Sequence, residues 1–79
     1  MKISTLKQDQ IKTDLLNVYL SAGNYIATPE TDFEIYFEDN IWVACLTLQD
    51  ENYKPVEIYA NLSWSTKKVL KNSIEIVRR

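Results

Sequence analysis

The sequence predicts a single α+β domain in which two helices pack on one face of a three-stranded antiparallel sheet. Apolar residues recur at helical spacing near both ends of the chain, and three segments between them alternate apolar and polar residues as strands do. Seventy-nine residues, 46% of them hydrophobic and 25% charged, suffice for one small core. We therefore expect one domain over residues 1–79, in two layers, with the order helix, three strands, helix.

The first helix is expected from about residue 5 to residue 22. Thr5 followed by Gln8 fits a capping box, in which two side chains satisfy free N–H groups of the first turn. Gly23 is suited to end the helix in a left-handed conformation. The apolar residues at helical spacing between these ends are Ile11, Leu15, Val18, Tyr19 and Ala22.

The three strands are expected over residues 33–38, 41–48 and 56–62, after a connection over residues 24–32. Asp39 and Asn40 form a two-residue hairpin loop between the first two strands, because both residue types tolerate positive φ. This loop fixes the register of the hairpin. The expected opposite pairs are Phe37 with Trp42, Ile35 with Ala44, and Phe33 with Leu46.

The hairpin register assigns each side chain to one of two faces, because successive side chains of a strand point to opposite sides. The face toward the helices is expected to hold Phe33, Ile35, Phe37, Trp42, Ala44 and Leu46, with either Val56 or Ile58, and Leu62 and Trp64. The opposite face is expected to hold Glu34, Tyr36, Glu38, Ile41, Val43, Cys45, Glu57, Tyr59 and Asn61. That second face is apolar and aromatic in its middle and acidic around it.

The segment after the third strand favours a second helix over residues 66–79. Ser65 or Thr66 can cap it. The apolar residues that then share one side of the helix are Val69, Leu70, Ile74, Ile76 and Val77, and the basic residues lie on the other side. The competing interpretation is a strand, because residues 74–76 alternate as Ile-Glu-Ile.

Charge is distributed unevenly along the chain. Residues 30–57 contain eight acidic residues and one basic residue, whereas residues 58–79 contain five basic residues and one acidic residue. The net charge of −2 conceals this separation. Such a charge pattern steers encounters with other molecules and selects among them, so it favours binding as the function.

The residues needed for common enzyme chemistry are missing, and we expect no catalysis, metal site or cofactor. The chain has no histidine, the usual general base near neutral pH. Cys45 lies in the middle of a predicted strand without a histidine to activate it. A single cysteine forms no internal disulfide, and no apolar run reaches the length of a membrane span. These features favour an intracellular protein that does not enter the membrane.

The acidic face of the sheet is the leading candidate for a binding surface. Tyrosine and aliphatic side chains ringed by charge are typical of protein interfaces. We expect a small inhibitor or immunity-type protein, of the kind phages and mobile elements encode, that binds a basic protein such as a nucleic-acid-binding protein. The alternative for the same face is a homodimer. The expected contact residues are Glu34, Tyr36, Glu38, Asp39, Val43, Glu57 and Tyr59.

Two short motifs resemble the double-stranded-RNA-binding domain. These are residues 15–19, Leu-Leu-Asn-Val-Tyr, and residues 65–72, Ser-Thr-Lys-Lys-Val-Leu-Lys-Asn. That family has the same order of helix, three strands and helix, and the lysines that open its last helix contact phosphates. The resemblance implies an alternative function, RNA binding through Lys67, Lys68 and Lys71. The family's Gly-Pro-x-His loop has no counterpart, since the hairpin loop here is Glu38-Asp39-Asn40.

Overall fold

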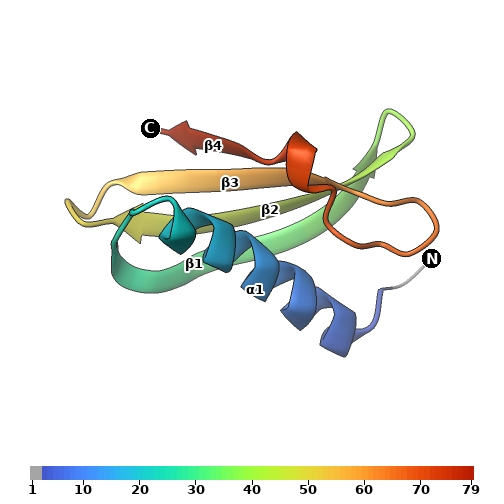
Figure 1. Ribbon diagram of the computed structural model, residues 1–79, viewed down its shortest axis with the longest axis horizontal. Coiled ribbons are helices and arrows are strands. Elements are labelled where there is room, and N and C mark those ends of the chain that lie inside the picture. The colour runs from blue at the N-terminus through green and yellow to red at the C-terminus, as the bar shows by residue number, and fades with distance from the viewer. Residues whose placement is uncertain (1–2) are drawn as a thin grey trace.

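Over the residues that the structure describes, the protein folds into one α-helix and a four-stranded antiparallel sheet. The computed structural model describes residues 3–79, without the side chains of residues 29 and 30. The elements are α1 (Thr5–Ser21), β1 (Ile26–Glu38), β2 (Ile41–Asp50), β3 (Pro55–Leu62), the short 3-10 helix η1 (Lys71–Ser73) and β4 (Glu75–Arg78). The strands lie in the order β1-β2-β3-β4, so each one pairs with its neighbour in sequence. Figure 1 shows α1 crossing one face of this sheet.

The predicted helix–sheet–helix architecture is wrong. Residues 66–79 do not form a second helix: they make a turn, η1 and the fourth strand. β4 pairs with β3, placing Glu75 opposite Tyr59 and Ile76 opposite Ile58. The strand interpretation of this segment was therefore the correct one. A fourth strand satisfies backbone N–H and C=O groups along the edge of β3, which a helix would leave unpaired.

The predicted first helix is confirmed, with its cap one residue earlier than expected. Ser4 is the N-cap, and its hydroxyl accepts a hydrogen bond of 3.2 Å from the backbone N–H of Lys7. The Gln8 amide donates to the backbone carbonyl of Ile3 at 2.8 Å, so it does not pair with Thr5. At the other end Gly23 has φ of +86°, the left-handed conformation that the sequence predicted.

The predicted hairpin is confirmed in its loop and its register. Asp39 and Asn40 have φ of 52° and 62°. All three expected pairs are present: Phe37 with Trp42, Ile35 with Ala44, and Phe33 with Leu46. β1 is longer than expected, because it starts at Ile26 within the segment predicted as a connection. Its pairing with β2 shifts twice between Ile26 and Asp32, and these irregularities hid the strand from a simple period-two pattern.

The core lies between α1 and one face of the sheet. α1 contacts β2 and β3, the two central strands. Val56 and Ile58 are both buried, although the sequence left open which of them faces the helix. Trp64 was expected in the core, but 64% of its surface is exposed, because it follows the end of β3. The buried residues of the core are Ile11, Leu15, Tyr19, Ala44, Leu46, Leu48, Val56, Ile58, Ala60 and Leu62.

Candidate functional site

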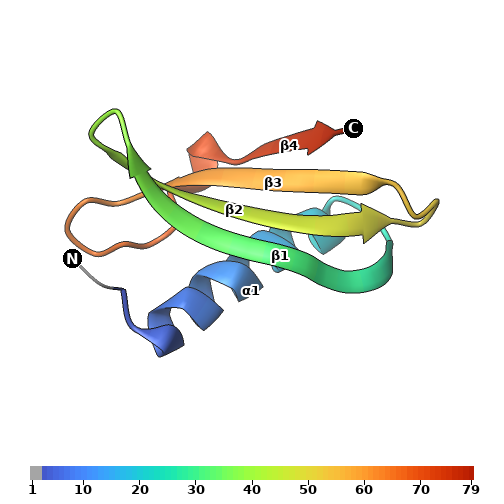
Figure 2. The same cartoon turned by 180° about the vertical axis from the view of Figure 1, so that it is seen from behind.

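The face of the sheet opposite α1 is not covered by a helix (Figure 2). The register places Tyr36 opposite Val43, and Cys45 opposite Tyr59. This alternation brings the seven predicted contact residues together: Asp39 lies in the β1–β2 turn, and the other six point to this side of β1, β2 and β3. We call it the open face, defined by Glu34, Tyr36, Glu38, Ile41, Val43, Cys45, Glu57, Tyr59 and Asn61, as predicted.

Cys45 lies in the middle of the open face, opposite Tyr59 on β3. It is only 6% exposed, although no helix covers this side of the sheet. Burial is the main cause that raises the pKa of Cys45, so the thiol is held in its protonated form. Burial, followed by the neighbouring Cys45, raises the pKa of Tyr59 to about 12. Burial, followed by the charge of Glu38, likewise raises the pKa of Tyr36. These groups are neutral at pH 7 and suit packing and hydrogen bonding.

The charge separation of the sequence is partly cancelled by the fold. Arg79 donates two hydrogen bonds to the Glu57 carboxylate, one of 2.7 Å from Nε, and this contact raises the pKa of the arginine. Arg78 forms an ion pair with Asp50 at 3.8 Å. The basic end of the chain thus returns to the acidic middle through β4. On the open face Glu34 and Glu38 are exposed, as is Asp39 in the adjoining turn.

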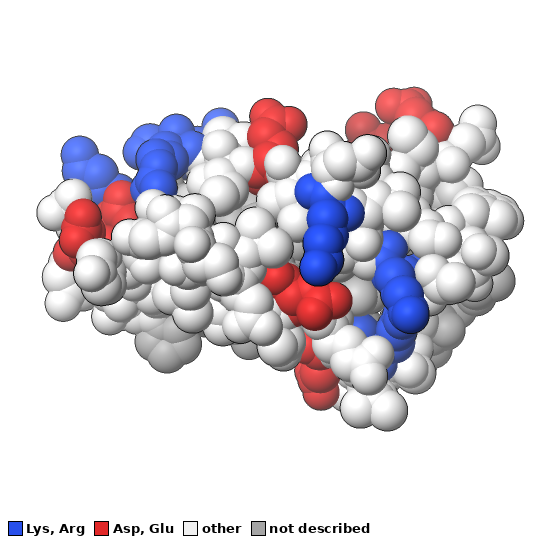
Figure 3. All heavy atoms as spheres, viewed as in Figure 1, with Lys and Arg blue, Asp and Glu red and all other residues white. Residues whose placement is uncertain are grey.

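The helix side of the molecule carries charges of both signs. Figure 3 shows Lys and Arg interspersed with Asp and Glu on that side, without a large patch of one sign. The RNA-binding alternative uses Lys67, Lys68 and Lys71. All three lie in the segment between β3 and β4, outside any α-helix. Lys68 lines a hollow beside α1 together with Lys7 and Asp14, and Lys71 opens η1. The basic helix face that the resemblance implied is therefore absent.

Lys67 is a buried lysine held between two tryptophans. It is 8% exposed, and its Nζ lies 5.6 Å from the centre of the Trp42 ring and 5.2 Å from that of Trp64. The same Nζ donates a hydrogen bond to the backbone carbonyl of Trp64. The backbone of Lys67 has φ of 60° and its N–H donates to the Ser63 carbonyl at 2.9 Å. These contacts enclose the Lys67 ammonium group within the turn after β3.

An aromatic cluster at the hairpin end of the sheet was missed by the sequence analysis. Phe37 lies 5.1 Å from Trp42 and 5.6 Å from Trp64, measured between ring centres, and Phe37 is 46% exposed. The alternation correctly put Phe37 and Trp42 on the helix side. However, α1 contacts the central strands and leaves this corner partly open. No pattern in the sequence separates this corner from the rest of the core face.

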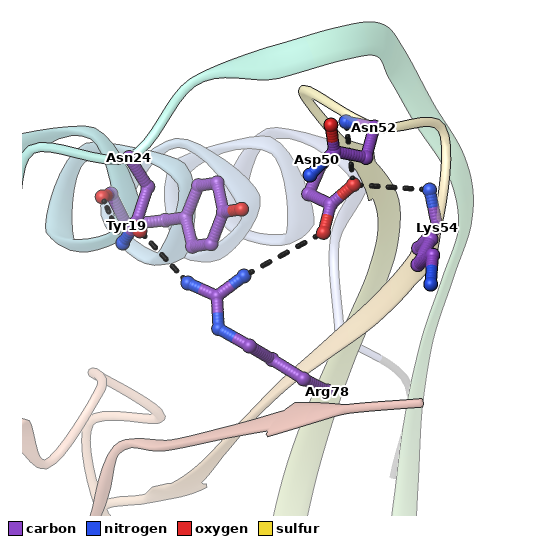
Figure 4. Close-up of polar contacts among 6 residues, drawn as sticks. All are labelled: Tyr19, Asn24, Asp50, Asn52, Lys54 and Arg78. Atoms are coloured by element: carbon purple, nitrogen blue, oxygen red, sulfur yellow. Dashed lines mark hydrogen bonds and ion pairs between the residues drawn. The ribbon is translucent and has the colours of Figure 1, made fainter.

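Arg78 joins three elements at the opposite end of the sheet, as Figure 4 shows. Its Nη2 donates to the Asn24 side-chain oxygen at 2.8 Å, and its guanidinium carbon lies 5.8 Å from the centre of the Tyr19 ring. Asn24 in turn donates to the backbone carbonyl of Tyr19 at 3.1 Å. Asp50 accepts hydrogen bonds from the backbone N–H groups of Asn52 and Lys54, which are the main cause that lowers its pKa. The sequence had placed Arg78 only among the basic residues of the expected second helix.

Among the described side chains of residues 3–79, no group of three or more cysteine, aspartate and glutamate residues is placed to hold a metal ion. In the same part of the chain no helix has both the length and the apolar character needed to cross a membrane.

Comparisons with known proteins return no match: no protein-family model matches the chain, and the searches of curated proteins and of solved structures find none at a significant level.

Proposed function

We propose that this protein is a small, non-enzymatic protein-binding module of the inhibitor or immunity type. It binds a basic surface of another protein, such as a nucleic-acid-binding protein, through the open face. The observation that supports this proposal is the uncovered sheet face itself. Tyr36, Val43 and Tyr59 form its half-buried middle, and the exposed carboxylates of Glu34, Glu38 and Asp39 lie beside them on β1 and its turn.

The chemistry of the open face suits a protein partner. Tyrosines supply large contact areas and lose little side-chain entropy on binding, which is why they are common at the energetic centre of interfaces. Half-buried Tyr36 and Tyr59 are already held by their neighbours on the sheet, so the face is preorganised. Exposed Glu34 and Glu38 lie along β1, with exposed Asp39 in the turn that follows, and they give this edge of the open face a negative potential, which favours a positively charged partner.

The same residues do not suit nucleophilic or acid–base catalysis. Cys45, the only thiol, is buried with a raised pKa, and a thiol is a good nucleophile only as the thiolate. The chain contains no histidine. These observations support binding over catalysis as the function of the open face.

The test is capture of the partner by tagged wild-type protein from a lysate of the source organism, with and without nuclease. The captured protein is then measured against four variants. Glu34→Lys and Tyr36→Ala change the open face. Asp9→Lys places a similar charge change on exposed helix surface, and Tyr53→Ala removes an exposed tyrosine from a turn.

The proposal expects nuclease-resistant capture that the open-face variants lose and the two controls retain, with all four variants folded by circular dichroism. Equal capture by wild type and both open-face variants would refute it. Sedimentation of the free protein tests the homodimer alternative, which predicts dimers at micromolar concentration. RNA binding stays a prediction that the nuclease arm tests, because captured RNA would favour a role for exposed Lys68 and Lys71.

A further inference from the structure

The long strand β1 lies at one edge of the sheet, with only β2 paired to it. Figure 2 shows β1 as the outermost strand, with no other strand beyond it. It has 13 residues, whereas β4 at the opposite edge has 4, and its pairing with β2 is regular over residues 32–38. The outer side of an edge strand exposes backbone N–H and C=O groups that can pair with a strand of another molecule.

The hairpin register shows which backbone groups of β1 point outward. In a two-residue hairpin the residues that flank the turn, here Glu38 and Ile41, form a hydrogen-bonded pair, and such pairs alternate with non-bonded pairs along the strand. The backbone groups of Phe33, Ile35 and Phe37 therefore point away from β2. In agreement, the Phe33 N–H donates at 2.9 Å to the side-chain carboxylate of the preceding residue. The N–H groups of Ile35 and Phe37 point the same way and are available to a new strand.

The side chains at these outward positions are only partly covered. They lie on the α1 side of the sheet, but α1 packs mainly against β2 and β3. Ala44 and Leu46 of β2 are almost fully buried. Ile35 and Phe33, which lie opposite them on β1, are half-buried, and Phe37 is 46% exposed. A strand added beside β1 would therefore remove apolar surface from water as well as pair backbone groups.

The charge of β1 determines which kind of strand can pair with it. Residues 26–39 contain five acidic residues and no basic residue. Glu34 and Glu38 are exposed on the open face, and Asp39 is exposed in the turn. A second copy of this chain aligned along the same edge would bring like charges together, which disfavours pairing of β1 with itself. A strand with lysine or arginine would place opposite charges across the pair.

The alternation of side chains gives the pattern that such a strand needs. Positions opposite Glu34 and Glu38 lie on the open face, where basic residues fit. Positions opposite Phe33, Ile35 and Phe37 lie on the α1 side, where apolar residues fit. We propose that the outer edge of β1 binds an extended segment of a basic protein as a fifth strand, with basic and apolar residues in alternation. This inference rests on the proposed function for its choice of a basic protein partner, and it states how that partner contacts the sheet.

The test is amide hydrogen exchange of the isotopically labelled full chain, followed by two-dimensional NMR with and without a short peptide. The probe peptide alternates arginine and valine and has blocked ends. One control peptide has the same composition with all its arginines before its valines, so it keeps the charge and loses the alternation. A second control has glutamate in place of arginine.

Two variants at one position test the backbone contact directly. Ile35→Pro removes the outward N–H without removing a hydrogen bond to β2, and edge strands tolerate proline at such positions. Ile35→Val is the matched control, because it keeps both the N–H and an apolar side chain. Circular dichroism checks that both variants fold.

We expect the alternating peptide to bind with a dissociation constant below about 1 mM and both control peptides to bind at least about tenfold more weakly. It should slow exchange of the Ile35 and Phe37 amides at least about tenfold, and the Tyr36 amide, which already faces β2, should change little. Ile35→Pro should weaken the peptide at least about fivefold, and Ile35→Val by less than about twofold.

Unchanged exchange at Ile35 and Phe37 when the peptide is in excess would overturn the inference, as would equal binding of the alternating peptide and the peptide of the same composition. Slow exchange of these amides in the free protein that increases with its concentration would also overturn it, because a second copy would then occupy the edge. The exchange experiment uses the wild-type chain, so it decides even if Ile35→Pro does not fold. Capture of a partner that still depends on Tyr36 would then leave the proposed function standing while this inference fails.

Discussion

Lys67 lies with its Nζ 5.2 Å from the ring centre of Trp64 and donates a hydrogen bond to the carbonyl of the same residue. This contact fixes the turn after β3. Lys67→Met keeps most of the side-chain volume but removes the cation and the donor. We expect it to lower the free energy of unfolding by about 1–3 kcal/mol, because a cation–π contact and a charge-assisted hydrogen bond are lost.

Urea denaturation measures this effect, with Lys68→Met as the control. Lys68 is the next residue and is exposed, so its replacement should change the free energy of unfolding by less than about 0.5 kcal/mol. Equal unfolding midpoints for the two variants would contradict a structural role for the Lys67 ammonium.

Asp50 predicts a loss of stability in acid. Its folded-state pKa is lowered, first by the backbone hydrogen bond from Lys54. Its contribution to stability is therefore complete above the unfolded-state pKa of about 4, and is lost as the pH falls through the lower, folded-state pKa. We expect Asp50→Asn to reduce the difference between urea midpoints measured near neutral pH and in acid. An unchanged difference would mean that other carboxylates account for the acid response.

Tyr59 predicts a loss of stability in alkali. Its folded-state pKa is raised to about 12, mainly by burial. The unfolded state ionises near pH 10, so stability should fall as the pH rises from about 10 to 12. Near-ultraviolet absorbance of tyrosinate follows the ionisation, and Tyr59→Phe should reduce the late step, to which Tyr36 also contributes because its pKa is raised as well. A late step of unchanged amplitude in Tyr59→Phe would assign the whole step to other tyrosines.

Leu15 and Leu20 provide a matched test of how α1 packs. Leu15 is fully buried under the sheet, and Leu20 is exposed on the same helix. Leu15→Ala should lower the free energy of unfolding by about 2–5 kcal/mol, because it removes buried methyl groups and leaves a cavity. Leu20→Ala should change it by less than about 1 kcal/mol. Thermal unfolding of both variants tests which side of α1 packs on the sheet. Similar melting temperatures would contradict the orientation in which Leu15 is buried and Leu20 is exposed.

The β1–β2 hairpin could be predicted in detail because its signals are local. Asp39 and Asn40 mark the turn, and the period of two from Phe33 to Leu46 then fixes every pair. The open face followed directly from this register. Local signals of this kind do not depend on the rest of the chain.

The end of the chain could not be predicted for the opposite reason. Val69, Leu70, Ile74 and Ile76 fit the spacing of a helix, but the free edge of β3 decides their structure. β4 is only four residues long, so its alternating pattern is too short to outweigh the helical one. The contacts of Arg78 and Lys67 could not be predicted either. Arg78 contacts Asn24 and Asp50, and Lys67 contacts Trp42, and only the folded sheet brings these distant segments together.

Successive residues of β3 alternate between the hydrophobic core and the open face. Val56, Ile58 and Ala60 are buried in the core, whereas Glu57 and Tyr59 lie on the open face. Substitutions among the first set leave cavities, and substitutions among the second leave the core intact. In diverging descendants of this sequence, the rate of amino-acid substitution along β3 should therefore be low at core positions and high at the open-face positions between them. The binding partner of the open face can then change in evolution while the hydrophobic core stays the same.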